Sequence, residues 1–216
     1  MDWLTDVIEF IRQRPERFLD LVFAHLRLSF TSLAIAALIY LPLGVLFSRM
    51  PRFGAQAAGI FSAVRVIPSL ALVFLFYPFL GFGQPPATVA LVVLAAPALI
   101  MNTFAGLRNV DAAALEAAKG VGMNDAQVFF RVQMPLALPV IIAGLRLAAV
   151  ELLASATLAS FVGAKSLGQY ILTGISLLDT TYLLAGGIPI VVLVLLADGL
   201  FNLLERVVTP PGARAA

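Results

Sequence analysis

The chain has 216 residues, of which 61% are hydrophobic and 12% charged, and its formal net charge is +2. Soluble domains are about half apolar and a quarter charged, so this composition indicates an integral membrane protein, most simply of one domain. The small net charge gives no indication of a nucleic-acid partner. The absence of cysteine excludes disulfides and thiolate ligands, and one histidine leaves little for a metal centre, so we expect no metal site.

The first residues are amphipathic. Apolar side chains such as Trp3 and Val7 recur at helical spacing between charged residues, and Pro15 interrupts the pattern. This favours a helix on the membrane surface over residues 1–24, with a partly ordered tail as the alternative. We treat 1–21 as an N-terminal segment, 22–206 as the membrane domain and 207–216 as a C-terminal tail.

Apolar runs of spanning length then follow one another along the chain. They predict an all-α membrane protein with five transmembrane helices, because about 20 apolar residues cross the hydrocarbon core. The expected spans are residues 25–48, 57–80, 87–107, 138–161 and 182–204. We expect His25 to be solvated at the edge of the first span, and Arg65 to snorkel toward the nearer side of the membrane from the second.

A polar segment separates the third and fourth spans. Asp111 is placed to cap a short helix, and Gly120 and Gly122 should end it. Asn124 or Asp125 can begin a second helical turn, which we expect to stop at the proline that follows. Alanines at 114, 117 and 118 would give the first helix a face that another protein can approach closely. The alternative is a polar loop that only joins two spans.

The spacing in this segment is specific. Glu116-Ala117-Ala118 is followed after three residues by Gly122, and after nine more by Val132-x-Met134-Pro135. This resembles the EAA signature of type I ABC importer permeases, with Val and Met in place of Ile and Leu. The resemblance implies a cytoplasmic coupling helix between spans three and four that docks in a groove of an ATPase subunit. The coupling residues that it implies are Glu116, Ala117, Ala118, Gly122, Met134 and Pro135.

Less specific sequence resemblances indicate one branch of that family. Ile67-Pro-Ser-Leu-Ala71, Pro135-Leu-Ala-Leu-Pro139 and Ala143-Gly-Leu-Arg146 resemble permeases for glycine betaine, choline and related osmoprotectants. Lys165, Ser166 and Glu151 depart from the pattern of the branch. The resemblance implies a permease dimer, of identical or paralogous copies, two ATPase subunits and an extracytoplasmic binding protein in a bacterial inner membrane. No Walker motif occurs in the chain, so we expect no catalytic residues and no cofactor here, with ATP and Mg held by the ATPase.

Basic residues predict the orientation. The side of the EAA segment carries seven of them, and the opposite connections carry Lys165 beside an N-terminal segment whose arginines are matched by acids. The positive-inside rule therefore puts the N-terminus outside and the C-terminus in the cytoplasm. The seven are Arg49, Arg52, Arg108, Lys119, Arg131, Arg206 and Arg214.

Polar residues within the spans are candidates for the translocation path: Ser69, Asn102, Thr103, Glu151 and Thr157. Asn102 either lines the path or bridges helices. A mid-membrane carboxylate costs about 2.5–3.5 kcal/mol on insertion scales, so Glu151 should face the protein or water. It either bonds to a neighbouring helix, through Asn102, Thr103 or a partner subunit, or attracts a cationic substrate. Arg146 lies on another face of the same helix.

Two other functions stay open on these residues. The coupling motif cannot separate osmoprotectant permeases from permeases of the same fold for amino acids or other small solutes. An ion-coupled secondary transporter would use buried ionisable groups, and Glu151 and Asp198 are available for that role. Such a transporter tends to have inverted repeats, and we find none in the sequence.

Overall fold

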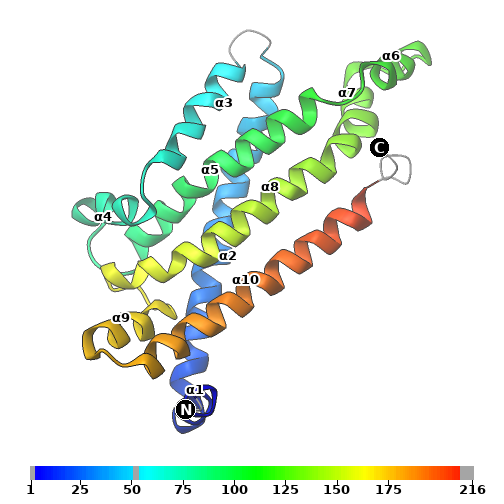
Figure 1. Ribbon diagram of the computed structural model, residues 1–216. Helices are drawn as coiled ribbons and strands as arrows, with labels where there is room; N and C mark the ends of the chain where they lie inside the picture. Colours follow the sequence, from blue (N-terminus) through cyan, green and yellow to red (C-terminus); the bar gives the residue numbers. More distant parts are fainter. Residues whose placement is uncertain (1–2, 51–53, 210–216) are drawn as a thin grey trace.

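The computed structural model describes residues 3–50 and 54–209. Within these ranges the chain is helical, without strands. Four helices are long and apolar enough to cross a membrane, and a bent pair of shorter helices can supply a fifth crossing. The long helices that form the bundle in Figure 1 are α2 (Pro15–Ser48), α5 (Gln84–Arg108), α8 (Met134–Ser155) and α10 (Thr180–Val208). Helix α5 packs against both α2 and α8, and α8 packs against α10.

The first span begins earlier than the sequence predicts. Helix α1 (Trp3–Gln13) is separate, and α2 begins directly after Arg14, with Pro15 in its first turn. A proline fits there because the first N–H groups of a helix have no partner within it. The helix boundary therefore lies ahead of residue 21, and residues 15–24 continue into the first span. Helix α1 is held by Phe10, whose ring lies 4.6 Å from that of Tyr182 between centroids.

The second span is not one helix. Helices α3 (Gly54–Ser62) and η1 (Ala63–Val66) are followed by α4 (Ser69–Leu80), and the two arms differ in direction by 94°. The continuous helix expected over residues 57–80 is therefore wrong. Pro68 has no N–H to donate, and Ile67 before it is extended, with φ −79° and ψ 123°.

Small residues let the bundle helices approach closely at α5. A Cβ atom added to Gly44 of α2 would lie 2.6 Å from Cβ of Thr103, and one added to Gly144 of α8 would lie 2.6 Å from Cβ of Asn102. Both distances are below contact range, so only glycine fits at either position. Close packing of this kind replaces the hydrophobic driving force that is missing between helices in lipid.

The histidine lies inside the bundle rather than at its edge. His25 is fully buried, and its Nε2 lies 2.9 Å from the carbonyl oxygen of Leu153. Because a carbonyl only accepts, Nε2 is the donor. Leu153 is in the last turn of α8, before the 3₁₀ segment η3 (Ala156–Val162), where helix carbonyls lack their usual partners. The expectation of a solvated interfacial histidine is therefore wrong.

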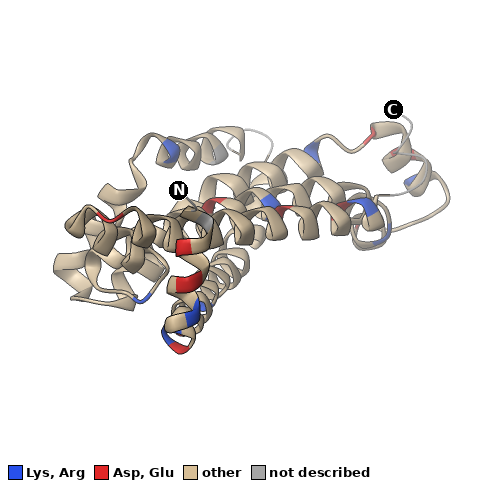
Figure 2. Cartoon of the chain, turned by 60° about the horizontal axis from the view of Figure 1, so that its bottom comes forward, with Lys and Arg blue, Asp and Glu red and all other residues tan. Residues whose placement is uncertain are grey.

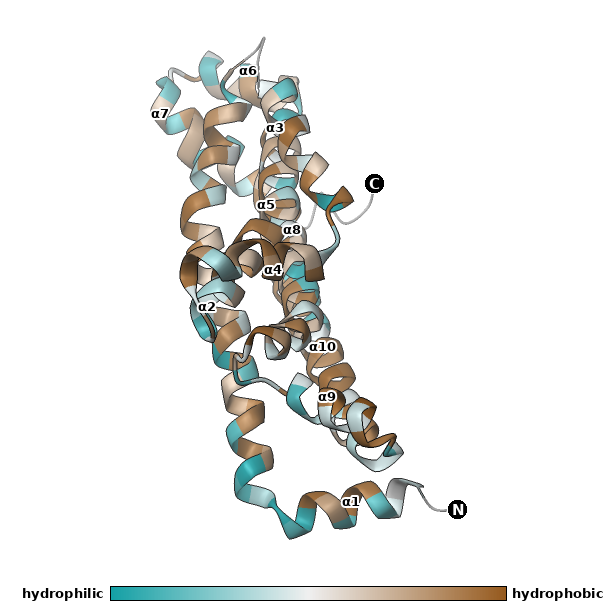
Figure 3. Ribbon diagram, turned by 90° about the vertical axis from the view of Figure 1, so that its left-hand side faces the viewer, coloured by the Kyte–Doolittle hydropathy of each residue, from teal (hydrophilic) through white to brown (hydrophobic). Residues whose placement is uncertain are grey.

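The two ends of the bundle differ. Helices α6 (Ala112–Gly120) and α7 (Asp125–Val128) lie at one end with the last turn of α10, and α1 and α9 (Gly168–Leu177) lie at the other. Charged residues are sparse along the long helices (Figure 2). In Figure 3 hydrophilic colours gather at α6 and α7 and where α1 meets α2. An apolar middle between two polar ends is the arrangement that a bilayer requires.

Candidate functional site

The helices of the EAA segment begin at side-chain caps. Oδ1 of Asp111 accepts from the backbone N–H of Ala113 at 3.0 Å, so Asp111 caps α6 as predicted. Asn124, rather than Asp125, caps α7. Its Oδ1 accepts from the N–H of Gln127 at 2.9 Å, while its own N–H donates to Oε1 of Gln127 at 3.0 Å. This reciprocal pair is a capping box and fixes how the chain enters α7.

Helix α6 ends at a glycine motif. Gly122 has φ +85°, a left-handed conformation that costs little only for glycine. Its N–H donates to the carbonyl of Lys119 at 2.9 Å, and the N–H of Met123 donates to that of Ala118 at 3.2 Å. These two bonds make a Schellman motif with Gly122 at the position after the cap. The predicted stop at Gly120 and Gly122 is confirmed.

The exposed face of α6 differs slightly from the one predicted. Glu116 and Ala117 are exposed, but Ala118 is buried and only 6% exposed. Ala118 therefore packs inward and cannot belong to a docking face that includes Ala114 and Ala117. Val121 is 76% exposed beyond the end of the helix. Glu116, Ala117 and Val121 present one carboxylate and apolar atoms outward, and we call this surface the docking face after its predicted role.

Pro135 does not end the second helical turn. A π-helical turn, η2 (Phe129–Gln133), leads directly into α8, and Pro135 lies in the first turn of α8. The wider π turn leaves room where a proline ring would otherwise strike the carbonyl four residues earlier. Met134 is half-buried against the cluster of Leu107 and Phe129. Met134 thus packs between the segment and the bundle, whereas Pro135 is exposed.

The segment is tied firmly to the bundle. Nε2 of Gln133 donates to the carbonyl of Leu107 at 3.0 Å, which joins η2 to the end of α5. The guanidinium of Arg49 lies 4.3 Å from the centre of the Phe129 ring, which joins η2 to the end of α2. A cleft of about 670 Å³ lies between these elements and α6. The segment therefore contacts the ends of α2 and α5 and continues directly into α8.

The path candidates lie in different environments. Asn102 is half-buried, and its Nδ2 donates to the carbonyl of Ala98 in its own helix at 2.8 Å. Thr103 is buried against α2. Ser69 is half-buried at the start of α4, and Thr157 is half-buried in η3. The role of these four positions in a path stays a prediction.

Glu151 lines an open cleft. The cleft holds about 350 Å³ and is bounded by Arg65, Leu147, Val150 and the half-buried Glu151. In the part of the chain that the structure describes, the Glu151 carboxylate makes no hydrogen bond and no ion pair. The expected bonds to Asn102 and Thr103 are therefore not formed within the chain. A carboxyl group that borders an open cleft and makes no internal hydrogen bond can meet solvent or a solute.

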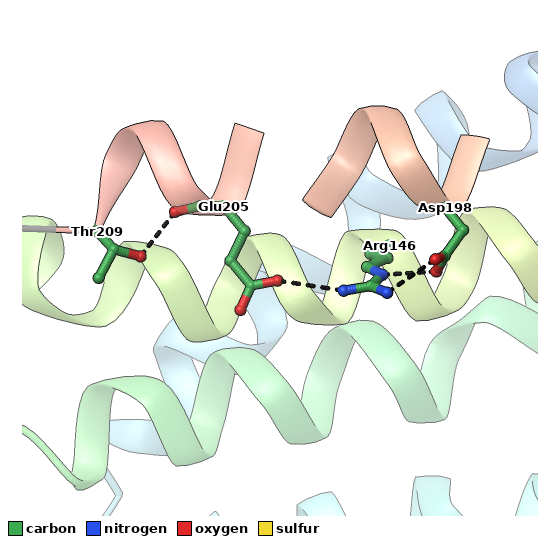
Figure 4. Close-up of polar contacts among 4 residues, drawn as sticks. All are labelled: Arg146, Asp198, Glu205 and Thr209. Carbon is green, nitrogen blue, oxygen red and sulfur yellow. Dashed lines mark hydrogen bonds and ion pairs between the residues drawn. The ribbon is translucent and has the colours of Figure 1, made fainter. Parts of the chain in front are cut away.

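An ion pair joins α8 to α10. Nε and Nη2 of Arg146 donate to Oδ1 and Oδ2 of Asp198 at 2.6 and 2.8 Å, and Nη1 lies 3.7 Å from Oε2 of Glu205 (Figure 4). The hydroxyl of Thr209 donates to the carbonyl of Glu205 at 2.7 Å. Sequence reasoning missed this link between α8 and α10; two opposite charges inside different spans were its only signal.

Comparison with known proteins identifies the family. Residues 40–210 match the model of the family described as binding-protein-dependent transport system inner membrane component. The choline transport system permease protein OpuBB of Bacillus subtilis (strain 168) is 35% identical over 206 residues, 95% of each chain. The glycine betaine/carnitine/choline transport system permease protein OpuCB of the same organism is 34% identical over 209 residues, 97% of this chain and 96% of the other.

The fold is similar to that of a chain in a solved transporter. A chain of the MetNI methionine ABC transporter, in an inward-facing conformation, superposes with a TM-score of 0.78 at 24% identity, over 90% of this chain and 97% of that one. The predicted membership of the type I ABC importer permeases, in the osmoprotectant branch, is confirmed. The chain belongs to the family of binding-protein-dependent transport system inner membrane components and is a permease component of an ABC importer.

Proposed function

We propose that this permease imports a quaternary ammonium osmoprotectant, such as glycine betaine, choline or a related compound. The observation that carries the proposal is the likeness over 95% of the chain to a relative named as a choline permease. Glu151 agrees with it, because a carboxylate on an open cleft attracts a cation. Leu147 and Val150 beside it offer apolar contact to methyl groups without an aromatic cage, so the cation would be held weakly and released readily.

The EAA segment would be the contact with the motor. Two ATPase subunits, which bind ATP and Mg, would each receive one α6 on its docking face of Glu116, Ala117 and Val121. Gly122 ends α6 so that α7 can turn back toward the bundle. Closure of the ATPases would move the two segments together, and the helices tied to them would rock between inward-open and outward-open states.

The clefts on α8 suggest where a second subunit lies. Glu151 and the Arg146–Asp198 pair lie on neighbouring parts of α8, and Leu147 and Val150 border both clefts. Charges on that face would be costly against lipid, so a second permease copy or a paralogue would cover it and enclose the path. The extracytoplasmic binding protein would deliver the substrate at the end that carries α1 and α9.

The EAA segment supports one orientation in the bacterial inner membrane. Five basic residues lie in the described part of the α6–α7 end: Arg49, Arg108, Lys119, Arg131 and Arg206. The opposite end carries Lys165, which is paired with Asp20 at 3.0 Å, and the arginines at positions 12, 14, 17 and 27, which lie among four acidic residues. Because the resemblance implies a cytoplasmic coupling segment, the α6–α7 end would be cytoplasmic and the N-terminus external. Arg52, Arg214 and the C-terminal residue Ala216 lie outside the described residues.

An uptake assay tests the substrate. The chain is expressed with its cognate ATPase and binding protein in cells that lack osmoprotectant importers, and uptake of labelled glycine betaine, choline and neutral amino acids is compared. We expect uptake of a quaternary ammonium compound that disappears when the binding protein is omitted. Uptake of an amino acid alone would contradict the proposal and favour a permease of the same fold for another solute.

A further inference from the structure

The Glu151 cleft contains both signs of charge. Arg65 of η1 and Glu151 of α8 border the same cleft of about 350 Å³, yet no ion pair within 4.0 Å joins them in the described part of the chain. On the same helix Arg146 is bound by Asp198 at 2.6 and 2.8 Å. The fold thus neutralises one arginine by direct contact and leaves another facing a carboxylate across open space.

The break in the second span places Arg65 there. Pro68 ends η1 and turns the chain by 94°, so Arg65 lies at the bend and on the cleft rather than on a straight helix. We expected its side chain to reach toward the basic end of the protein. Instead it borders a cleft with a residue of the fourth span. Two separated charges at membrane depth are costly unless water or a ligand meets both.

We infer that this cleft selects a zwitterion: a small solute with a quaternary ammonium group for Glu151 and a carboxylate for Arg65. The inference rests on the proposed function and narrows its substrate class to betaines. A guanidinium suits the contact with the carboxylate of the solute, because its N–H donors match the two carboxylate oxygens. The methyl groups of the ammonium would lie against Leu147 and Val150. Choline, which has no carboxylate, would leave Arg65 without a partner.

Direct binding tests the inference apart from the selectivity of the binding protein. The permease–ATPase complex is placed in lipid nanodiscs without the binding protein and titrated with glycine betaine or choline by ligand-observed NMR. We expect wild type to bind glycine betaine about tenfold more tightly than choline, which equals ~1.4 kcal/mol. Arg65→Gln should abolish this preference by weakening glycine betaine alone, and Glu151→Gln should weaken both ligands.

Two further variants serve as controls. Arg65→Lys keeps the charge and should keep the preference for glycine betaine, whereas Arg12→Gln removes a cation on α1, away from the cleft, and should change neither affinity. Equal affinities of wild type for the two ligands, or no binding of either, would overturn the inference even if Arg65→Gln cannot be purified. An Arg65→Gln complex that still binds glycine betaine more tightly than choline would also overturn the inference. Uptake assayed with the binding protein shows whether the proposed function fails together with the inference. If neither compound is imported, the proposed function is wrong as well.

Discussion

The end of α6 allows a sharp test of coupling, through Gly122→Ala. Gly122 has φ +85°, and a Cβ atom added to it would meet nothing within 4 Å. The substitution therefore causes no clash, and its whole effect comes from a left-handed backbone. That conformation costs an L-residue about 1–2 kcal/mol. If the ATPase binds only the native turn, its affinity for the permease should fall about 5- to 30-fold.

Gly120→Ala is the matched control. Gly120 also has open space around its Cβ position, but it is the last residue of α6 and its φ is not positive. Alanine should strengthen the helix there by about 0.5–1 kcal/mol, and coupling should be unchanged. Both variants are purified in detergent, and the ATPase subunit is titrated onto them. Unaltered affinity for Gly122→Ala, or equal losses for the two variants, would refute the role of the turn.

Three more predictions concern other parts of the molecule. Glu116→Lys should leave the permease in the membrane but reduce ATPase co-purification, because it reverses the one charge of the docking face; normal co-purification would contradict this. Asp198→Asn should lower the thermal unfolding temperature, since Arg146 loses its bidentate partner, and adding Arg146→Gln should restore part of the loss; an unchanged temperature would show that the pair does not stabilise the fold. In this cysteine-free chain, Lys165→Cys should react with an impermeant thiol reagent from outside intact cells and Lys119→Cys should not, and the opposite pattern would invert the orientation.

Lys165 is a better position than Ser166 for the topology experiment. Ser166 is an obvious external position from the sequence, but it is fully buried, and its hydroxyl lies 2.7 Å from that of Ser160. A cysteine there would be shielded from any reagent on either side. Lys165 is exposed, with 67% of its side chain accessible, so it reports the side correctly.

Local signals predicted the EAA segment well. A cap at Asp111 and a stop at Gly122 depend on residues within one or two turns, so the sequence contains the whole arrangement. The apolar runs predicted five spans, and four of them are single long helices in the described part of the chain, because hydropathy and length decide whether a helix can cross a membrane. The inward position of Ala118 could not be predicted, since it depends on how α6 lies against the rest of the protein.

Features that depend on packing between spans could not be predicted from the sequence. Pro68 breaks its span, yet Pro42, Pro97 and Pro139 lie inside continuous helices, so a proline alone does not reveal a break. The burial of His25 depends on a carbonyl 128 positions along the chain. Arg146 and Asp198 are 52 residues apart and meet only because α8 packs on α10. Each contact joins different spans, and one sequence does not contain the register between them.

We propose above that ATP hydrolysis by a partner subunit drives import through this chain. The most direct measurement is accumulation of glycine betaine in proteoliposomes that contain the permease and its ATPase, with the binding protein on the substrate side. We predict accumulation with ATP and Mg on the α6–α7 side, none with a non-hydrolysable analogue, and no response to a proton or sodium gradient. Accumulation driven by an ion gradient without ATP would contradict the account and identify a secondary transporter.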